Sequence, residues 1–357
     1  MKEQNKVSLI LFLLFFILAA NAAAEDISID LESYLKISLE NSRELKEAEL
    51  NLKAKAINLK EVEAEQEVNP SPSLLTQAKL ELELAEKKLL RKEDELINNY
   101  INDFFNYFKT ENSVEVHQRY LKVIKNEMEN IEDKYEQGLL TKSDIYQAEV
   151  ELKTVESNLV KARNDKERVG FKLKQNLNNE KNDQLDMKFS ESDLKAWELN
   201  EDFEELLDIS LKNRIDIKEA EVNKELKKIN FKLAARDYSP KLKKIEAENE
   251  YLSALNNTKV AKDMVELDLN NAYLNFKDSL ENINKDRKLI ESYNEALIVK
   301  KLYFEEDYIT GVELLAAQVD LYQAEVSFSH SKIDYYLSLT ELYLSTGDFK
   351  ELLIYAE

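Results

Sequence analysis

The stretch Y-E-Q-G-L-L-T-K-S-D-I-Y-Q-A-E-V, from Tyr135 to Val150, places one turn between two long apolar patterns. Before the turn, apolar residues recur every three or four positions, at Leu121, Ile124, Met128, Ile131 and Tyr135. After it the same spacing returns, at Ile145, Ala148, Leu152, Val155, Leu159 and Ala162. Each pattern is a heptad seam, and within the turn Gly138 enters a left-handed conformation without steric cost. The stretch therefore predicts an antiparallel helical hairpin that reverses at Gly138.

The same design returns in the second half of the chain. A second seam, at Phe276, Leu280, Ile283, Ile290, Leu297 and Phe304, leads to the turn E-E-D-Y-I-T-G and a returning seam at Leu314, Ala317, Leu321, Ala324, Phe328 and Tyr335. L-K-I-S-L-E-N at 35–41 likewise returns as L-D-I-S-L-K-N at 207–213. These matches predict an internal duplication.

The phrase D-I-Y-Q-A-E-V at 144–150 leaves the register of the repeat open. It returns as D-L-Y-Q-A-E-V at 320–326, an offset of 176 residues, whereas alignment of the two turns gives an offset of 169. The difference is one heptad, which returns every side chain to the same helix face, so both registers satisfy the packing. The phrase is either seam packing around Ala148 and Ala324 or a recognition motif.

Composition predicts an all-α fold with few, very long elements. Only 4 Gly and 3 Pro occur among 357 residues, of which 43% are hydrophobic. We expect helices over about 74–137 and 242–304, each on the order of 95 Å long. The aromatic run at Tyr100, Phe104, Phe105, Tyr107 and Phe108 is expected to need neighbours from another copy of the chain. We divide the chain into a first repeat (25–177), an inter-repeat linker with Trp197 (178–200), a second repeat (201–350) and a tail (351–357).

The N-terminus predicts export to the cell envelope. Lys2 and Lys6 precede an apolar run from Val7 to Ala20, and small residues follow at 22–24, so residues 1–24 have the features of a signal peptide. The same segment is alternatively retained as an anchor. The formal net charge of −21 argues against nucleic acid as a partner, and the absence of cysteine excludes disulfides.

No motif predicts catalysis, and we expect no enzymatic activity, no metal and no cofactor. The two histidines, His117 and His330, lie far apart in sequence and beside apolar stripes, which favours packed side chains over ligands. The chain contains neither a glycine-rich phosphate loop nor a G-x-S-x-G sequence. The abundant carboxylates are interpreted as solvated helix faces.

Taken in order, these sequence features resemble the TolC-like outer-membrane efflux protein family. They are an export signal, L-x-x-S-L-x-N, a reversal marked by Pro72 or Pro240, Y-x-x-G-L-L-T and a long heptad return. The resemblance covers most of residues 28–350 and includes S-T-G-D-F at 345–349. It implies a homotrimer in which two hairpins per subunit build a hollow periplasmic tunnel, associated with the outer membrane. It also implies that the hairpin turns meet a periplasmic adaptor protein, which links them to an inner-membrane pump.

The resemblance gives roles to both turns. Their docking residues are expected to be Gly138, Leu139, Leu140, Thr141, Asp307, Tyr308, Ile309 and Thr310. Exposed apolar turn residues fit docking, and a capping contact onto the helix ends explains them equally. The resemblance also places a possible tunnel constriction at Asp144 and Glu313, although Ala316 stands where the family often has a second acidic residue.

The chain departs from the family at the prolines. Family members have membrane-spanning strands there, but 68–84 holds one short alternating stretch, and the residues after Pro240 are charged on both faces. We therefore expect two coiled-coil hairpins without a substantial β-barrel, ending in a helical cap or joined by a pore from another protein. The preferred hypothesis is a conduit component of a tripartite efflux or type I secretion system. The alternative is a non-conducting periplasmic scaffold or binding protein.

Overall fold

The computed structural model describes residues 29–178, 187–188, 199, 201–236, 240–306, 308–347 and 349. The described part is helical, and its only β-pairing is an isolated bridge between Ile29 and Met187. The helices follow the same order in both halves: α2 (Leu31–Asn41), α3 (Arg43–Gln66), α4 (Pro72–Glu136) and α5 (Lys142–Asn176), then α6 (Phe203–Asn213), α7 (Ile215–Ala234), α8 (Lys241–Glu305) and α9 (Gly311–Thr346). The predicted all-α fold with two long hairpins is confirmed.

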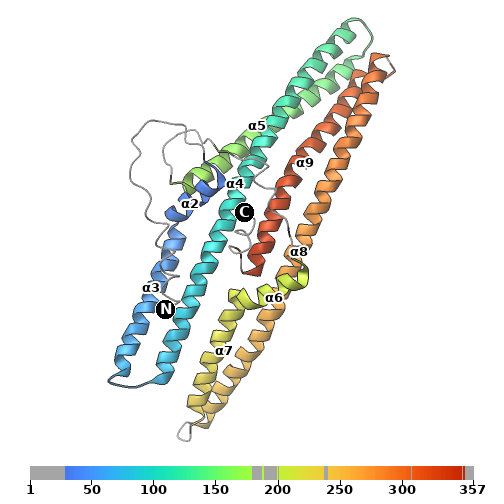
Figure 1. The fold of residues 1–357 in the computed structure, drawn as a ribbon. Coiled ribbons are helices and arrows are strands. Elements are labelled where there is room, and N and C mark those ends of the chain that lie inside the picture. The colour runs from blue at the N-terminus through green and yellow to red at the C-terminus, as the bar shows by residue number, and fades with distance from the viewer. Residues whose placement is uncertain are drawn as a thin grey trace, which may run out of the picture.

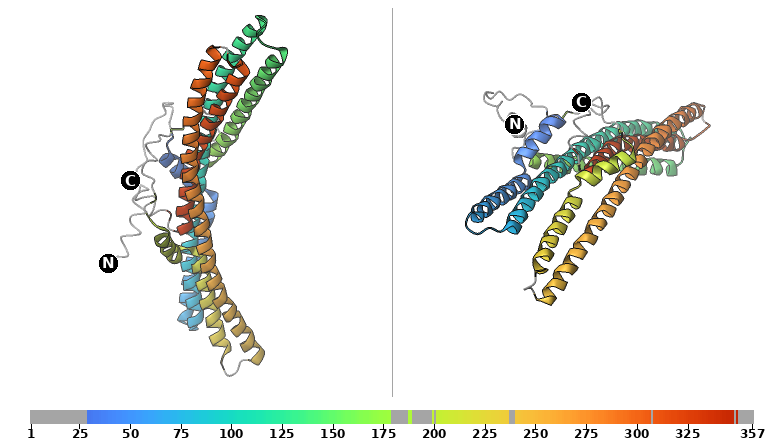
Figure 2. Two further views of the ribbon diagram at one scale, coloured as in Figure 1. Left: turned by 90° about the vertical axis from the view of Figure 1, so that its right-hand side faces the viewer. Right: turned by 60° about the horizontal axis from the view of Figure 1, so that its bottom comes forward.

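The two long helices run the length of the molecule, and each has two shorter partners (Figure 1). α4 and α8 have 65 residues each, and their ends agree with the predicted bounds to within two residues. In the half that carries the turns at 137–141 and 306–310, neighbouring helices follow the order α5, α4, α9, α8. In the other half the order is α3, α4, α7, α8. The chain is therefore a long wall whose free edges are α5 and α3 on one side and α8 on the other, and the wall bends along its length (Figure 2).

The main core lies at mid-height, where α2 and α6 pack onto the wall. Tyr34 of α2 and Phe104 and Phe105 of α4 are fully buried there, with ring contacts between Tyr34 and Phe104 and between Phe105 and Tyr336 of α9. Burial of such rings contributes about 1.5–3 kcal/mol each. The expectation that the aromatic run needs another copy is wrong, because helices of the same chain cover it.

The repeated sequence L-x-I-S-L-x-N forms the C-terminal part of both short helices, α2 and α6. Ser38 and Ser210 are fully buried, and Asn41 and Asn213 are the last residues of α2 and α6. The Asn41 amide donates to the Leu177 carbonyl at 3.1 Å, which ties α2 to the end of α5. In the second half, the Arg214 guanidinium donates to the Ser345 carbonyl at 3.1 Å. The last residue of the repeated sequence in the first half, and the residue just after it in the second half, thus hold the ends of α5 and α9 at mid-height.

The predicted seams are largely correct. Ile124, Met128 and Ile131 of α4 and Ala148 and Val155 of α5 belong to one buried cluster. Ala324 is buried as well, so both alanines of the repeated phrase are seam residues. Tyr135 and Leu280 are corrections: both side chains are exposed, and Ser279 is buried in place of Leu280.

Several sequence interpretations fall outside the described residues. These are the signal segment, Trp197 with most of the proposed linker, Asp307, and the tail at 351–357. Within the described helices, none combines the length and the apolar character that a bilayer crossing requires.

Candidate functional site: the hairpin tips and the wall edges

The first tip, residues 135–141, is closed by backbone and cap hydrogen bonds. Gly138 has a φ of 76°, the left-handed value expected for it. The Leu139 N–H donates to the Lys134 carbonyl at 3.0 Å, as in a Schellman motif. Thr141 then caps α5: its hydroxyl accepts from the Asp144 N–H at 3.4 Å, and the Asp144 carboxylate accepts from the Thr141 N–H at 2.8 Å. This reciprocal capping box explains the sequence G-L-L-T-x-x-D.

The second tip, residues 304–310, repeats this geometry 169 positions later. The Tyr308 N–H donates to the Tyr303 carbonyl at 2.8 Å, the same bond that Leu139 makes to Lys134. Thr310 and Glu313 form the second capping box, with the Thr310 N–H donating to the Glu313 carboxylate at 2.9 Å. Of the two registers that the sequence leaves open, the tips therefore follow the offset of 169.

The apolar tip residues differ in exposure. Leu139 is 63% exposed and Tyr308 is 77% exposed, although the Tyr308 ring meets Tyr303 edge-on at 6.2 Å. Leu140 and Ile309 are half-buried, and Leu140 packs against the seam cluster below the first tip. Leu139 and Tyr308 are therefore the exposed apolar side chains of the two tips, while Leu140 supports the fold.

The two tips are joined into one surface. The Lys134 ammonium lies 3.9 Å from the centre of the Phe304 ring, a cation–π contact between the hairpins. Gly311, the first residue of α9, lies so close to Ile131 that an added Cβ would stand 2.9 Å from the Ile131 Cγ1 atom. Gly311 is thus a close-packing residue between the tips, whereas Gly138 is a turn residue.

The two carboxylates that the resemblance places at a constriction, Asp144 and Glu313, both act in caps. Hydrogen bonds from the backbone and then the side chain of Thr141 hold the pKa of Asp144 below its ordinary value. Hydrogen bonds from the backbone and then the side chain of Thr310 likewise lower the pKa of Glu313. Their part in a constriction would be a property of several assembled copies and stays a prediction.

The two histidines, distant in sequence, line one cavity of about 670 Å³ between α4, α5 and α9. His330 Nε2 lies 2.7 Å from the Ser113 hydroxyl, and His117 Nε2 lies 3.4 Å from the Tyr322 hydroxyl. The Ser113 hydroxyl also lies 2.9 Å from the Lys109 carbonyl, a second acceptor for its single proton. The buried Nδ1 of His117 finds no hydrogen-bond partner among the residues that the structure describes. Across the described residues, no three His, Cys, Asp or Glu side chains are arranged to hold a metal ion.

This cavity predicts acid sensitivity. Burial lowers the pKa of His117 and of His330; for His330, nearby Lys109 and His117 lower it further and Asp334 opposes them. A histidine whose folded-state pKa is depressed stabilises the protein above its unfolded value of about 6.5, and the contribution is lost as pH falls through the folded value. We expect the free energy of unfolding from urea titrations to fall between pH 7.5 and 5.5, and to fall less in the double variant H117Q/H330Q. An equal fall in both proteins would contradict the assignment.

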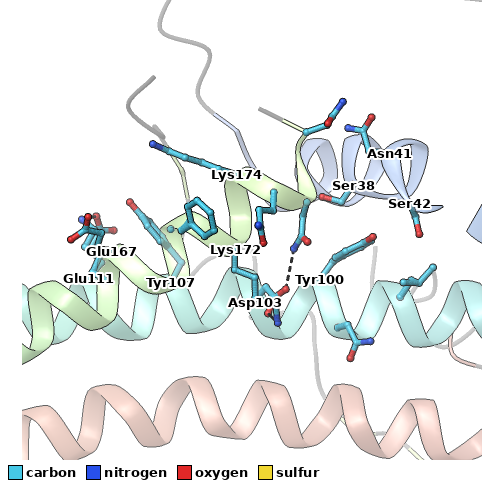
Figure 3. A pocket seen from close by; sticks show the side chains of 18 of the residues that line it. Ser38, Asn41, Ser42, Tyr100, Asp103, Tyr107, Glu111, Glu167, Lys172 and Lys174 are labelled. Carbon is cyan, nitrogen blue, oxygen red and sulfur yellow. Dashed lines mark hydrogen bonds and ion pairs between the residues drawn. The ribbon is translucent and has the colours of Figure 1, made fainter. Parts of the chain in front are cut away.

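A larger groove, of about 1620 Å³, lies between α2, α4 and α5 (Figure 3). Across it the Asn176 amide donates to the Tyr34 hydroxyl at 2.7 Å and to Asp103 at 3.0 Å, and Lys172 pairs with Asp103 at 2.6 Å. The labelled side chains in Figure 3 include Glu111, Glu167 and Lys174, so the lining mixes both charges. We interpret the groove as the joint between α2 and the end of α5.

The free edges of the wall expose apolar residues at positions that are covered in its interior. Leu315 and Val319 of α9 pack against the cluster of α4, and the residues 169 positions earlier on α5 are the exposed Tyr146 and Val150. These two line a shallow groove of about 650 Å³ on the outer face of α5. The α8 edge is likewise lined with exposed apolar side chains, among them Leu267, Leu274, Leu289, Ile298 and Leu302.

Comparison with solved structures identifies the fold. The outer membrane protein VceC of Vibrio cholerae has 14% identical residues and a TM-score of 0.73, covering 89% of this chain and 96% of VceC. The TolC-like fold is shown. The CmeC outer membrane channel of Campylobacter jejuni has 12% identity and a TM-score of 0.72, covering 96% of this chain and 97% of CmeC. The open state of the MtrE outer membrane channel of Neisseria gonorrhoeae has 14% identity and a TM-score of 0.70, covering 93% of this chain and 94% of MtrE.

Sequence comparison alone does not find this TolC-like fold. No protein-family model matches the chain, and no curated protein sequence matches it. With identities of this size, the likeness to the channels concerns the arrangement of the helices, and what the chain transports or contacts has to be argued from its own residues.

Proposed function

We propose that this TolC-like chain is an exported component of a tripartite efflux or type I secretion system. In this proposal copies of the chain, three in number as the resemblance implies, close into a periplasmic conduit at the outer-membrane side of the envelope. The observation that carries the proposal is the pair of unlike, apolar edges on the wall. Edges of this kind join head to tail, and head-to-tail contacts that close generate rings.

The interior of the wall supplies a template for the contact between copies. Within one chain α4 lies against α9. At the offset of 169 residues, α8 is the equivalent of α4, and α5 is the equivalent of α9. A ring would place α8 of one copy against α5 of the next in the same manner. The ion pair between Arg119 and Glu325, at 3.4 Å, then corresponds to Lys288 and Glu156 on the two edges. Within the described part of the single chain, Lys288 pairs with Glu291 and Glu156 pairs with Lys153, each on its own helix.

Association in solution tests the conduit. We expect light scattering coupled to size-exclusion chromatography at tens of micromolar to show a trimer of the mature chain. Tyr146→Asp with Val150→Asp should dissociate it, because charges would replace apolar surface at the contact, while the free energy of unfolding of the monomer changes by less than about 0.5 kcal/mol. The control is Val123→Asp, which makes the same change at an exposed position of the interior helix α4. A monomeric wild-type protein would refute the conduit.

The tips are proposed to dock a periplasmic adaptor protein, and Leu139 is the residue that tests this. Leu139→Asp should leave thermal stability nearly intact, since the side chain is largely exposed, and should weaken capture of recombinant adaptors from the same genome at least about tenfold. Leu90→Asp is the matched control, because Leu90 is an exposed leucine within α4 and lies far from the tips in sequence. Unaltered capture by Leu139→Asp would favour the explanation by helix capping.

The alternative function is a periplasmic scaffold that conducts nothing. The wall edges can assemble copies without enclosing a solute path, so association alone does not separate the two functions. Deletion of the gene followed by measurement of drug or dye export does. A conduit predicts that export falls and is restored by the wild-type gene, whereas a scaffold leaves export unchanged.

A further inference from the structure

The end of the wall opposite the tips carries opposite charges on its two hairpins. α3 reaches this end with Glu61, Glu63 and Glu65, followed by Glu67, and has no basic residue in its last turn. α8 starts from the same end with Lys241, Lys243 and Lys244 and has no acidic residue in its first turn. These three lysines stand within four residues, in a chain whose formal net charge is −21.

Both sets of charges are unfavourable for the helices that carry them. The backbone dipole favours cations at a helix C-terminus and anions at an N-terminus, and here α3 ends in glutamates and α8 begins with lysines. Glu61 and Glu65 also stand four residues apart on one helix face, where like charges repel. None of these seven side chains has an ion-pair partner among the described residues. The charges therefore lower the stability of the isolated chain.

Apolar side chains accompany the charges. Val68, just after α3, is 89% exposed, and Leu242, in the first turn of α8, is 80% exposed. An exposed apolar residue beside unpaired charges of one sign is typical of a surface that is covered by a partner of the opposite sign. Each hairpin end has this composition, and the two are complementary to each other.

We infer that the acidic end of α3 on one copy docks against the basic start of α8 on the next copy. The inference rests on the proposed assembly, in which α8 and α3 are the edges that meet in this half of the wall. Because α3 ends where α8 begins, the two helices would lie antiparallel with glutamates and lysines at the same level. The contact would seal the end of the conduit opposite the tips and would fix which edges join.

Charge reversal tests the docking. The triple variant K241E/K243E/K244E should associate about tenfold more weakly in sedimentation velocity, as three lost ion pairs imply, and E61K/E63K/E65K should do the same. The two triples in one chain should restore association to within about twofold of wild type. K87E/K122E/K125E changes the net charge equally on exposed lysines of the interior helix α4 and should have little effect.

The outcomes separate this inference from the assembly itself. A wild-type protein that stays monomeric refutes the proposed conduit, whereas a wild-type oligomer unaffected by either triple refutes only the docking of these ends. The lysines at the start of α8 could instead bind an anionic lipid surface. Flotation with vesicles of phosphatidylglycerol and phosphatidylcholine tests this. If K241E/K243E/K244E abolishes flotation and leaves association intact, the lysines serve a membrane and the inference is overturned.

Discussion

Gly347→Ala is expected to lower the free energy of unfolding by about 3 kcal/mol. Gly347 ends α9 with a φ of 73°, a conformation that costs an L-residue about 1–2 kcal/mol. An added Cβ would also stand 3.0 Å from the Arg214 backbone nitrogen and 3.1 Å from its Cα atom. These are backbone atoms at the junction of α6 and α7, so they cannot rotate away as a side chain would. Urea unfolding followed by circular dichroism measures the loss.

Gly170→Ala is the matched control. Gly170 lies inside α5, and its added Cβ would meet the Tyr107 ring at an ordinary 3.7 Å. Alanine there should gain about 0.5–1 kcal/mol, because glycine is a poor helix former. The first half of the chain has Asn178 at the position equivalent to Gly347, with a φ of 53°, and asparagine tolerates this conformation. A Gly347→Ala variant as stable as the wild type would show that the junction can relax.

The turn sequences predicted the tips well because each tip is specified locally. Gly138 supplies a left-handed residue, and Thr141 with Asp144 supplies a capping box, so three residue types at fixed spacing determine the geometry. The same logic placed the ends of α4 and α8. The spacing could not tell that Leu140 packs inward while Leu139 stays exposed, because that difference depends on a cluster of α4, α5 and α9 residues that comes together only when the chain has folded.

The covering of the aromatic run was not predictable from helix periodicity. Phe104 and Phe105 cannot both lie on one seam, and a pattern of single hairpins leaves one of them unburied. The missing information was the position of α2 and α9 relative to α4. Tyr34 of α2 covers Phe104, and Tyr336 of α9 covers Phe105. Two helices of the same chain therefore cover the run, and burial of these rings does not require a second copy.

The second seam contains a buried acidic residue that its apolar spacing does not predict. Asp286 stands between Ile283 and Ile290 at heptad spacing, and it is only 2% exposed. Its carboxylate accepts hydrogen bonds from Ser327 and Ser331 of α9, both at 2.7 Å. A polar residue at such a position specifies register, because its partners exist in one alignment only.

The position of Asp286 also explains why α8 and α9 pack in one register. A shift of one heptad along α9 would move Asp286 from the level of Ser327 to that of Asp320 or Asp334. Either neighbour would bring a second carboxylate toward a buried one, a repulsion that the apolar seam cannot offset. The offset of 169 seen at the tips and the placement of Asp286 therefore reinforce each other.

Removal of the two serines should have the other large effect. Burial raises the pKa of Asp286, but the hydrogen bonds from Ser331 and Ser327, together with nearby Lys285, outweigh it, and the pKa lies below its ordinary value. The double variant S327A/S331A would leave a buried carboxylate without these donors, at a cost of about 3 kcal/mol at pH 7. Urea unfolding at pH 7 measures it.

Acid titration and a compensating substitution separate this explanation from a simple packing defect. A carboxyl group with a depressed folded-state pKa stabilises the protein above its unfolded value of about 3.9, and the contribution is lost as pH falls through the folded value. The deficit of S327A/S331A should therefore shrink in acid. Adding Asp286→Leu should restore stability to within about 1 kcal/mol of the wild type, because an apolar group needs no donors. If the triple variant were as unstable as the double variant at every pH, the serines would act through packing, and Asp286 would not set the register of α8 against α9.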